Sequence, residues 1–300
     1  HHITCAVRRK HSDEFDKNHL FDQVRYFDTL NGKTDFGKTL KDIDVVIHLA
    51  ARAHIITKSV HDRHNEFLDI NFHGTRNLAE QAVKSGVKRF VFISSIGVNG
   101  KSTKNGMAYT EADVENPHNS YSVSKLKAEQ ALKKLEANTN MEVVIIRSPL
   151  VYGPDVKANF LRLLNLVNTG LPLPFAGIKN KRSFIAIDNL VDAIAECAVH
   201  AKAGGETFIV SDDQALSIPQ LLKKISNVMG RNPRLFYFPV PVFKALLTLS
   251  GKQEIYERLW GSLIVDSGKI RRQIGWRPKV SVDEGIQKTV QWYLKKNVVK

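Results

Sequence analysis

Cysteine, long apolar runs and metal-ligand spacings are scarce or missing in this 300-residue sequence. Its two cysteines, Cys5 and Cys197, lie far apart in apolar surroundings, which predicts free thiols in a reducing, cytoplasmic compartment. No segment approaches the roughly 18 apolar residues of a membrane span, and no signal peptide is visible at this N-terminus. These absences argue against a disulfide-stapled protein, a membrane-spanning protein and a metal protein.

Acidic residues are also few compared with basic ones. The chain has 44 Lys and Arg residues but only 30 Asp and Glu, so its formal net charge is +14. Such an excess favours anionic partners such as nucleotides, although a lysine-rich solubilising surface explains it equally well. The basic residues are scattered and not interleaved with aromatic ones, so no stacking platform for nucleic acid is predicted.

Along the first half of the chain, apolar runs typical of strands alternate with runs of helical period. We expect strands at 3–7, 24–27, 44–51, 88–95 and 142–147, and helices at 67–85 and 121–137. This alternation predicts an α/β fold with a doubly wound parallel sheet. After Pro149 the pattern changes, which predicts a smaller C-terminal α+β substrate lobe. The expected domains are 1–149, with return segments near 183–211, and a lobe made of 150–182 and 212–300.

A glycine-rich turn is the most informative absence. A dinucleotide-binding fold opens with a strand, a glycine-rich turn and a helix whose N-terminus holds the pyrophosphate. Neither G-x-G-x-x-G nor G-x-x-G-x-x-G occurs here, and the sequence begins with what is typical of the second strand. We therefore expect that the first strand and the glycine-rich turn, roughly 20 to 30 residues, precede this sequence.

The strongest chemical signal is Tyr121 followed four residues later by Lys125, at the start of a predicted helix. Positions four apart share a helix face, so the ammonium is expected to stabilise a phenolate and lower the pKa of Tyr121. Ser95 closes a predicted strand, where its hydroxyl could bond to the same substrate oxygen. This order of residues predicts proton transfer at an alcohol or ketone, with a nicotinamide alongside to carry the hydride.

One apolar stretch in the lobe, 239–249, has two possible placements. Its composition would suit a helix that lies on a membrane surface. The stretch is short and interrupted by proline, however, so burial within the lobe is favoured.

Longer motifs then indicate a family. They run through nearly the whole chain: 46–51 (VIHLAA), 71–78 (NFHGTRNL), 90–95 (FVFISS), the pair Tyr121 and Lys125, 147–154 (RSPLVYGP) and 182–190 (RSFIAIDNL). In this order they resemble the extended short-chain dehydrogenase/reductases, specifically the NAD-dependent epimerase/dehydratase family that acts on nucleotide sugars. The resemblance is greatest to bacterial polysaccharide-pathway epimerases and 4-ketoreductases. It implies a Rossmann-type fold, a UDP-sugar substrate, NAD or NADP as cofactor, and a homodimer built from the helices that carry Asn71 and Tyr121.

The resemblance also implies roles for individual residues. Tyr121 resembles the catalytic acid/base, Lys125 its partner that also holds the nicotinamide ribose, and Ser95 the hydroxyl helper. Cofactor contacts are expected at Arg8, Arg9, Asp28, Ala50, Ala51 and Ser94, as well as at Tyr121 and Lys125. Substrate contacts are expected at Ser95, Asn159, Phe160, Arg182 and Arg258. Asp28 could instead be a turn residue, Asn159 a helix cap and Arg182 a surface ion pair.

Three functions remain open at this point. A nucleotide-sugar 4-epimerase that retains NAD is slightly favoured. Arg8 and Arg9 occupy a region where an acidic residue would bind the NAD ribose, so an NADPH-dependent 4-ketoreductase of a UDP-4-keto-6-deoxy-N-acetylhexosamine is the alternative. A non-catalytic dinucleotide sensor is the third. A 4,6-dehydratase is not expected, because Ile96 and Gly97 replace the family's acidic pair.

Overall fold

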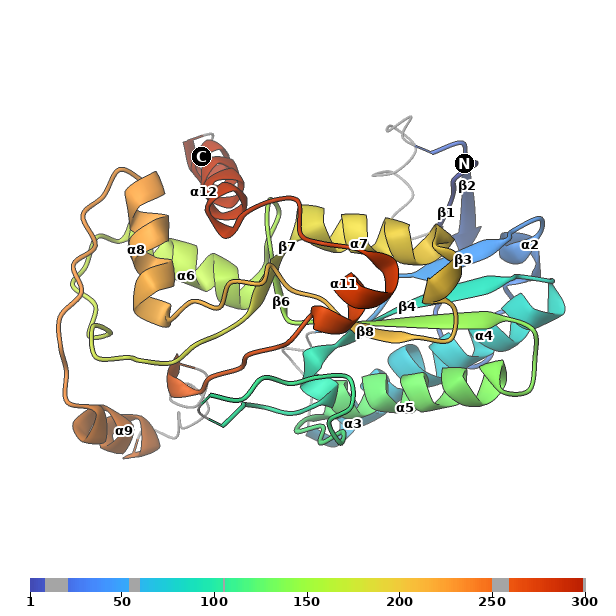
Figure 1. The fold of residues 1–300 in the computed structure, drawn as a ribbon, viewed down its shortest axis with the longest axis horizontal. Helices are drawn as coiled ribbons and strands as arrows, with labels where there is room; N and C mark the ends of the chain where they lie inside the picture. The colour runs from blue at the N-terminus through green and yellow to red at the C-terminus, as the bar shows by residue number, and fades with distance from the viewer. Residues whose placement is uncertain (9–20, 54–59, 105, 250–258, 299–300) are drawn as a thin grey trace. The chain divides into compact units, whose positions relative to one another are not determined.

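The computed structural model describes residues 1–8, 21–53, 60–104, 106–249 and 259–298. The chain forms two compact units, and each is described here by itself (Figure 1). Unit 1 contains His1–Val98, Glu115–Arg147 and Cys197–Thr207, and unit 2 contains Asn99–Val114, Ser148–Glu196 and Phe208–Lys300. This division assigns 99–114 to unit 2, whereas the sequence placed that segment in the first domain.

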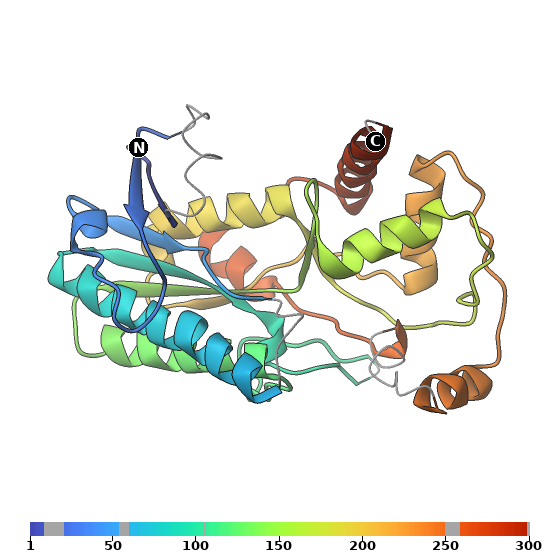
Figure 2. The same cartoon turned by 180° about the vertical axis from the view of Figure 1, so that it is seen from behind.

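Parallel strands form the sheets of unit 1 (Figure 2). β1 (Thr4–Arg8) pairs in parallel with β2 (Gln23–Phe27) as a two-stranded sheet. A second sheet has the order β3-β4-β5-β8, in which β3 (Val45–His48) and β4 (Arg89–Ser95) are parallel. Its other strands are β5 (Glu142–Ser148) and β8 (Thr207–Ile209), which runs on into unit 2. The expected α/β fold with parallel sheets is confirmed, and the upstream strand with its glycine-rich turn stays a prediction.

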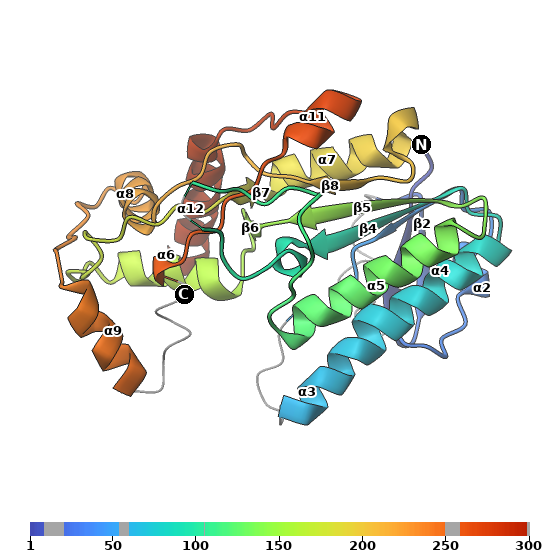
Figure 3. The same cartoon turned by 60° about the horizontal axis from the view of Figure 1, so that its bottom comes forward.

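Helices of unit 1 cover one face of the larger sheet. α4 (Thr75–Lys84) and α5 (Ser120–Glu136) run side by side there, as Figure 3 shows. α4 continues from α3 (Val60–Phe67) through a π-helical stretch (Leu68–Gly74), so the single helix expected at 67–85 begins earlier and changes its hydrogen-bond register. Short helices complete the unit: α2 (Gly37–Leu40), η3 (Ile96–Val98) and η4 (Ala201–Ala203).

The core of unit 1 lies between this sheet and these two helices. Phe90 and Phe92 from β4 pack with Ala82 from α4 and with Ala128 and Leu132 from α5, and all five are fully buried. β5 is buried along almost its whole length, as a strand covered on both faces should be. β3 differs, because Ile47 within it remains 43% exposed.

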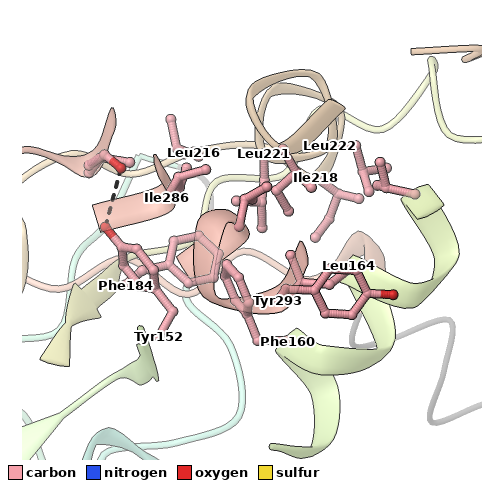
Figure 4. Close-up of a cluster of buried hydrophobic side chains, with 14 of the residues drawn as sticks. Tyr152, Phe160, Leu164, Phe184, Leu216, Ile218, Leu221, Leu222, Ile286 and Tyr293 are labelled. Carbon is pink, nitrogen blue, oxygen red and sulfur yellow. Dashed lines mark hydrogen bonds between the residues drawn. The ribbon is translucent and has the colours of Figure 1, made fainter. Parts of the chain in front are cut away.

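Unit 2 is built on a short parallel pair, β6 (Leu150–Tyr152) and β7 (Phe184–Ala186). Around it lie α6 (Ala158–Asn168), α7 (Ile187–Val199), α8 (Ile218–Val228), α9 (Val240–Leu249), α11 (Gly268–Ile274) and α12 (Val282–Val298). Figure 4 shows its core, where Phe160 stacks on Tyr152 and the Tyr152 hydroxyl donates to Asp212 over 2.8 Å. The buried Asp212 carboxylate also accepts hydrogen bonds from the Asn189 side chain and from the backbone N–H of Ala186. Its buried oxygens therefore have hydrogen-bond partners.

His48 is a buried titratable group at the end of β3. Its ring lies against Phe90 and Phe92, and its Nε2 is 2.9 Å from Thr75 Oγ1. Burial, and secondarily the charge of Lys125, lowers the pKa of His48 to about 3. The unfolded chain binds this proton near pH 6.5 while the folded chain does not, so His48 makes folding less favourable as the pH falls from about 6.5 to 3.

Replacing His48 by Gln should remove that dependence. Between pH 6.5 and 4, we expect the free energy of unfolding of His48→Gln to fall less steeply than that of the wild type, by up to about 1.4 kcal/mol per pH unit. Urea unfolding at a series of pH values measures both slopes. His73→Gln, at an exposed histidine, is the matched control substitution. If the free energy of unfolding had the same pH dependence in the wild type and in His48→Gln, the lowered pKa of His48 would be contradicted.

Candidate functional site

The first turn of α5 positions the predicted catalytic pair. Asn119 caps the helix, because its Oδ1 accepts from the backbone N–H of Ser122 over 2.8 Å. With the start of the helix set in this way, Tyr121 and Lys125 stand one turn apart on one face. Glu129 continues the same column one turn later. The expected pairing of Tyr121 with Lys125 on one helix therefore has the local geometry that the spacing indicates.

Lys125 is almost fully buried, at 2% exposure. Its Nζ lies 4.1 Å from the ring centroid of Phe92, in a cation–π contact. Burial lowers the pKa of Lys125 to about 7, against an opposing effect of the negative charge of Glu129. Near neutral pH the ammonium and the free amine are therefore both populated.

Tyr121 is held beside an aromatic neighbour. Its ring packs edge-on against Phe67, with centroids 6.1 Å apart. Burial raises the pKa of Tyr121, which differs from the lowered value that the sequence led us to expect. The physical reason is that burial desolvates the Tyr121 phenolate and so disfavours its charged form.

Ser95 and the start of α5 meet around Gly97. The Ser95 hydroxyl accepts from the Gly97 backbone N–H over 3.2 Å, and it is partly exposed. A Cβ atom added at Gly97 would lie 2.8 Å from Ser122 Oγ and 3.4 Å from Ser95 Oγ. Glycine at this position thus allows the end of β4 to approach the turn that carries Tyr121.

A buried ion-pair cluster supports this arrangement, and sequence reasoning missed it. Arg147 donates from Nη2 to Glu129 over 2.6 Å and to Glu115 over 3.0 Å, and it contacts Glu129 again through Nε. Ser94 donates its hydroxyl to Glu129. Glu129 and Arg147 are each 1% exposed. Ser94, expected to contact the cofactor, thus directs its hydroxyl to α5, and the spacing of Glu129 four residues after Lys125 was the available signal.

Asn71 is a second residue that links distant segments to the site. It is fully buried in the π-helical stretch, and it exchanges hydrogen bonds with both backbone groups of Arg52. Its amide also donates to Ser124 Oγ over 3.0 Å, and Ser124 in turn donates to the carbonyl of Tyr121. Asn71 therefore joins the loop after β3 to the first turn of α5.

The expected cofactor residues follow strand ends. Arg8 is the last residue of β1 and pairs with Phe27, so it lies at the same end of that sheet as Asp28. Ala50 and Ala51 follow β3, are exposed, and lie at the same edge of the larger sheet as Ser95, because β3 and β4 are parallel. Small exposed side chains beyond parallel strand ends fit a flat dinucleotide, which such folds bind there. Arg9 lies outside the described residues.

The expected substrate residues belong to unit 2. Asn159 is exposed near the start of α6. Phe160 is 1% exposed and stacks on Tyr152, so its side chain is part of the core and only its backbone could meet a ligand. Arg182 is half-buried and donates from Nη1 to the carbonyl of Gly261 over 3.0 Å. Arg258 lies outside the described residues.

Metal chemistry finds no support among the described residues. No group of three or more His, Cys, Asp or Glu side chains there could hold an ion. Cys5 and Cys197 are free thiols, as expected. What the arrangement offers is proton transfer by Tyr121, a second hydroxyl at Ser95 and a buried cation at Lys125.

Known proteins resemble this chain along most of its length. The model of the NAD dependent epimerase/dehydratase family matches residues 1–211. UDP-glucose 4-epimerase from Vibrio cholerae is 42% identical over 269 residues, which cover 89% of this chain and 82% of that protein. dTDP-D-glucose 4,6-dehydratase from Mus musculus is 28% identical, over 85% of this chain and 69% of that one. The fold matches the crystal structure of UDP-glucuronic acid 4-epimerase from Bacillus cereus in complex with NAD, with a TM-score of 0.77, 21% identity, and coverage of 100% and 92%.

Removing the charge of Glu129 should change the protonation of Lys125. In Glu129→Gln, burial of Lys125 is no longer opposed, so we expect its pKa to fall below about 7. Titration of Cε-labelled lysine by NMR measures this shift. Glu136→Gln, on the same helix two turns further on, should leave the titration unchanged. If the pKa of Lys125 were the same in Glu129→Gln and in the wild type, the effect of Glu129 on Lys125 would be disproved. A wild-type Lys125 that titrates near 10.5 would disprove the lowering of its pKa by burial.

Proposed function

The chain belongs to the NAD dependent epimerase/dehydratase family, and we propose that it is a nucleotide-sugar 4-epimerase acting on a UDP-hexose or UDP-N-acetylhexosamine. The observation that carries this proposal is that Tyr121 and Lys125 share one face of α5, whose first turn approaches the end of β4 at Ser95. The 42% identity to a UDP-glucose 4-epimerase supports the same reaction.

In the proposed mechanism, Tyr121 is the catalytic acid/base. Its ionised hydroxyl takes the proton of the sugar 4-hydroxyl, and Ser95 donates a hydrogen bond to the same oxygen. When bound, NAD would supply hydride exchange with C4 of the sugar. Tyr121 then gives its proton back to the 4-keto oxygen. With hydride exchange at the opposite face of the sugar, this proton transfer would invert C4 with no net oxidation. The positive charge of Lys125, which Glu129 favours, is proposed to stabilise the phenolate.

The residues present fit such a cofactor. The small side chains of Ala50 and Ala51 leave space beyond β3. Lys125 lies one helical turn after Tyr121 on the same face of α5 and is buried. Arg8 and Asp28, at one end of the β1–β2 sheet, are proposed to contact the adenosine part. Asn159 and Arg182 are proposed to bind the uridine diphosphate, together with the backbone at Phe160.

Gly97 argues against the dehydratase reaction of the more distant relative. That reaction would need acid/base groups after Ser95, where the family's dehydratases carry an acidic pair. Ile96 is buried and apolar, and a side chain at Gly97 would meet Ser122 Oγ at 2.8 Å. The site therefore supports hydride and proton exchange at C4 alone.

An NADPH-dependent 4-ketoreductase is the second candidate, favoured by one observation. Arg8 ends β1 beside Asp28, where a basic side chain suits the 2′-phosphate of NADP. Denaturing the purified protein and identifying the released dinucleotide separates the two functions. Stoichiometric NAD supports the epimerase. An empty protein that binds NADPH much better than NADH supports the reductase.

We also propose that the protein is a homodimer paired through α4 and α5. A pocket of about 520 Å³ lies along these two helices. Its lining includes the apolar residues Phe72, Ala79, Ala131 and Leu135 and polar ones such as Arg76, Glu80, Lys127 and Lys134. Apolar side chains in a pocket along two adjacent helices suit packing against the same two helices of a second copy. By light scattering, wild type should have the mass of two chains and Ala131→Asp that of one. Ala137→Asp, beyond this pocket, is the control.

Tyr121→Phe tests the catalytic assignment. Loss of the acid/base hydroxyl should lower the turnover of UDP-glucose or UDP-N-acetylglucosamine by about 10²- to 10⁴-fold, with little change in melting temperature. The dinucleotide content should stay at the wild-type level. A dinucleotide sensor would show no turnover in either protein, and unchanged turnover in the variant would refute the role of Tyr121.

A further inference from the structure

An exposed apolar patch on unit 2 is not explained by the reaction at C4. It consists of Leu171, Phe236, Tyr237, Val242 and Leu249, which are 62%, 44%, 68%, 48% and 86% exposed. Single exposed apolar residues are normal on a protein surface, but five on adjoining segments indicate an interaction site. We refer to these five residues as the exposed patch.

The segments that carry the exposed patch are physically joined. The Phe236 backbone N–H donates to the carbonyl of Leu173, and the Phe236 carbonyl accepts from the Ala176 N–H over 3.2 Å, so 171–176 runs alongside 234–236. α9 follows directly, and its Phe243 packs against Phe175, Phe238 and Trp260. α9, labelled in Figure 3, is thus fixed to unit 2 through Phe243. Val242 and Leu249 on the same helix are exposed to solvent.

This arrangement revises the expectation that 239–249 is buried. Phe243 provides the burial that was expected, whereas Val242 and Leu249 remain outside. Every helix among the described residues is too short or too polar to cross a membrane. A short apolar helix with exposed Tyr237 and Phe236 beside it has instead the composition of an element that lies in a membrane interface.

The two chain segments that carry the exposed patch have only basic charged residues. Segment 156–182 contains five Lys or Arg residues and segment 214–249 another five, and neither contains a single Asp or Glu. Arg231 and Arg234, just before Phe236, are both exposed. A surface of this kind is complementary to anionic lipid headgroups, which attract basic residues next to an inserted apolar face.

We propose that the exposed patch docks onto an anionic lipid bilayer, with α9 lying in the interface and Arg231 and Arg234 at the headgroups. A second copy of this chain docked through the same surface is a poorer partner, because it would bring the same basic segments against each other. Nucleic acid would leave the aliphatic side chains of Val242 and Leu249 without a partner. This inference is independent of the reaction proposed above.

Vesicle sedimentation tests the proposal with the whole protein. Wild type should bind vesicles of phosphatidylcholine containing about one third phosphatidylglycerol at least tenfold better than phosphatidylcholine alone, and salt should weaken that binding. The double variant Val242→Asp/Leu249→Asp should lose about tenfold in binding. Arg231→Gln/Arg234→Gln should lose roughly fivefold for each charge and show a smaller salt dependence.

Matched controls keep the result interpretable. Val114→Asp/Val199→Asp alters two other exposed valines, 86% and 57% exposed, and should bind as wild type does. Melting temperatures of all variants should agree, because each altered side chain is exposed. Wild type that sediments with neither vesicle overturns the proposal. So does equal binding by Val242→Asp/Leu249→Asp, or a change of molecular mass in that variant, which would assign the exposed patch to a protein contact.

Discussion

The buried ion pair of Arg147 with Glu129 is the interaction on which the site depends. It joins β5 to α5, and the hydrogen bond from Ser94 adds β4 to the same cluster. A buried charge whose partner is lost destabilises a protein by about 3–5 kcal/mol, whereas the intact pair contributes little net stability. The value of such a pair lies in specificity, since only one register of α5 on the sheet satisfies both charges. That register is the one that places Tyr121 at the edge of the sheet.

Charge balance extends from this pair to Lys125. Two cations, Arg147 and Lys125, are matched by two carboxylates, Glu129 and Glu115. Phe92 covers the ammonium and removes it from water, which brings its protonation equilibrium close to neutral pH. The site therefore responds to any further charge placed near it. A bound nicotinamide ring would alter the balance directly, which couples cofactor binding to the readiness of Tyr121 to lose its proton.

Much of this site could be predicted because its signals are local. Tyr121 and Lys125 are one helical turn apart, and the parallel sheet follows from alternating strands and helices, as the structure confirms. The family was confirmed by the comparisons.

The partners of Glu129 could not be predicted, because Ser94 and Arg147 lie on other strands and pair with it only after the chain has folded. The π-helical stretch at Asn71 depends on tertiary hydrogen bonds to Arg52 and Ser124, which no helical propensity records. The burial of Phe160 could not be predicted either, since a motif position can also place its side chain in the hydrophobic core.

The close packing around Gly97 bears on how members of this family could diverge. Many enzyme activities are separated by one or two substitutions and are therefore accessible to gradual change. Here, a Cβ atom at Gly97 would lie 2.8 Å from Ser122 Oγ, so an acidic side chain at that position requires Ser122 to shift or to be replaced. A larger residue at Gly97 therefore has to be accompanied by a change at or around Ser122 on α5. The close contact ties the residue types that position 97 can accept to the side chain that α5 presents at Ser122.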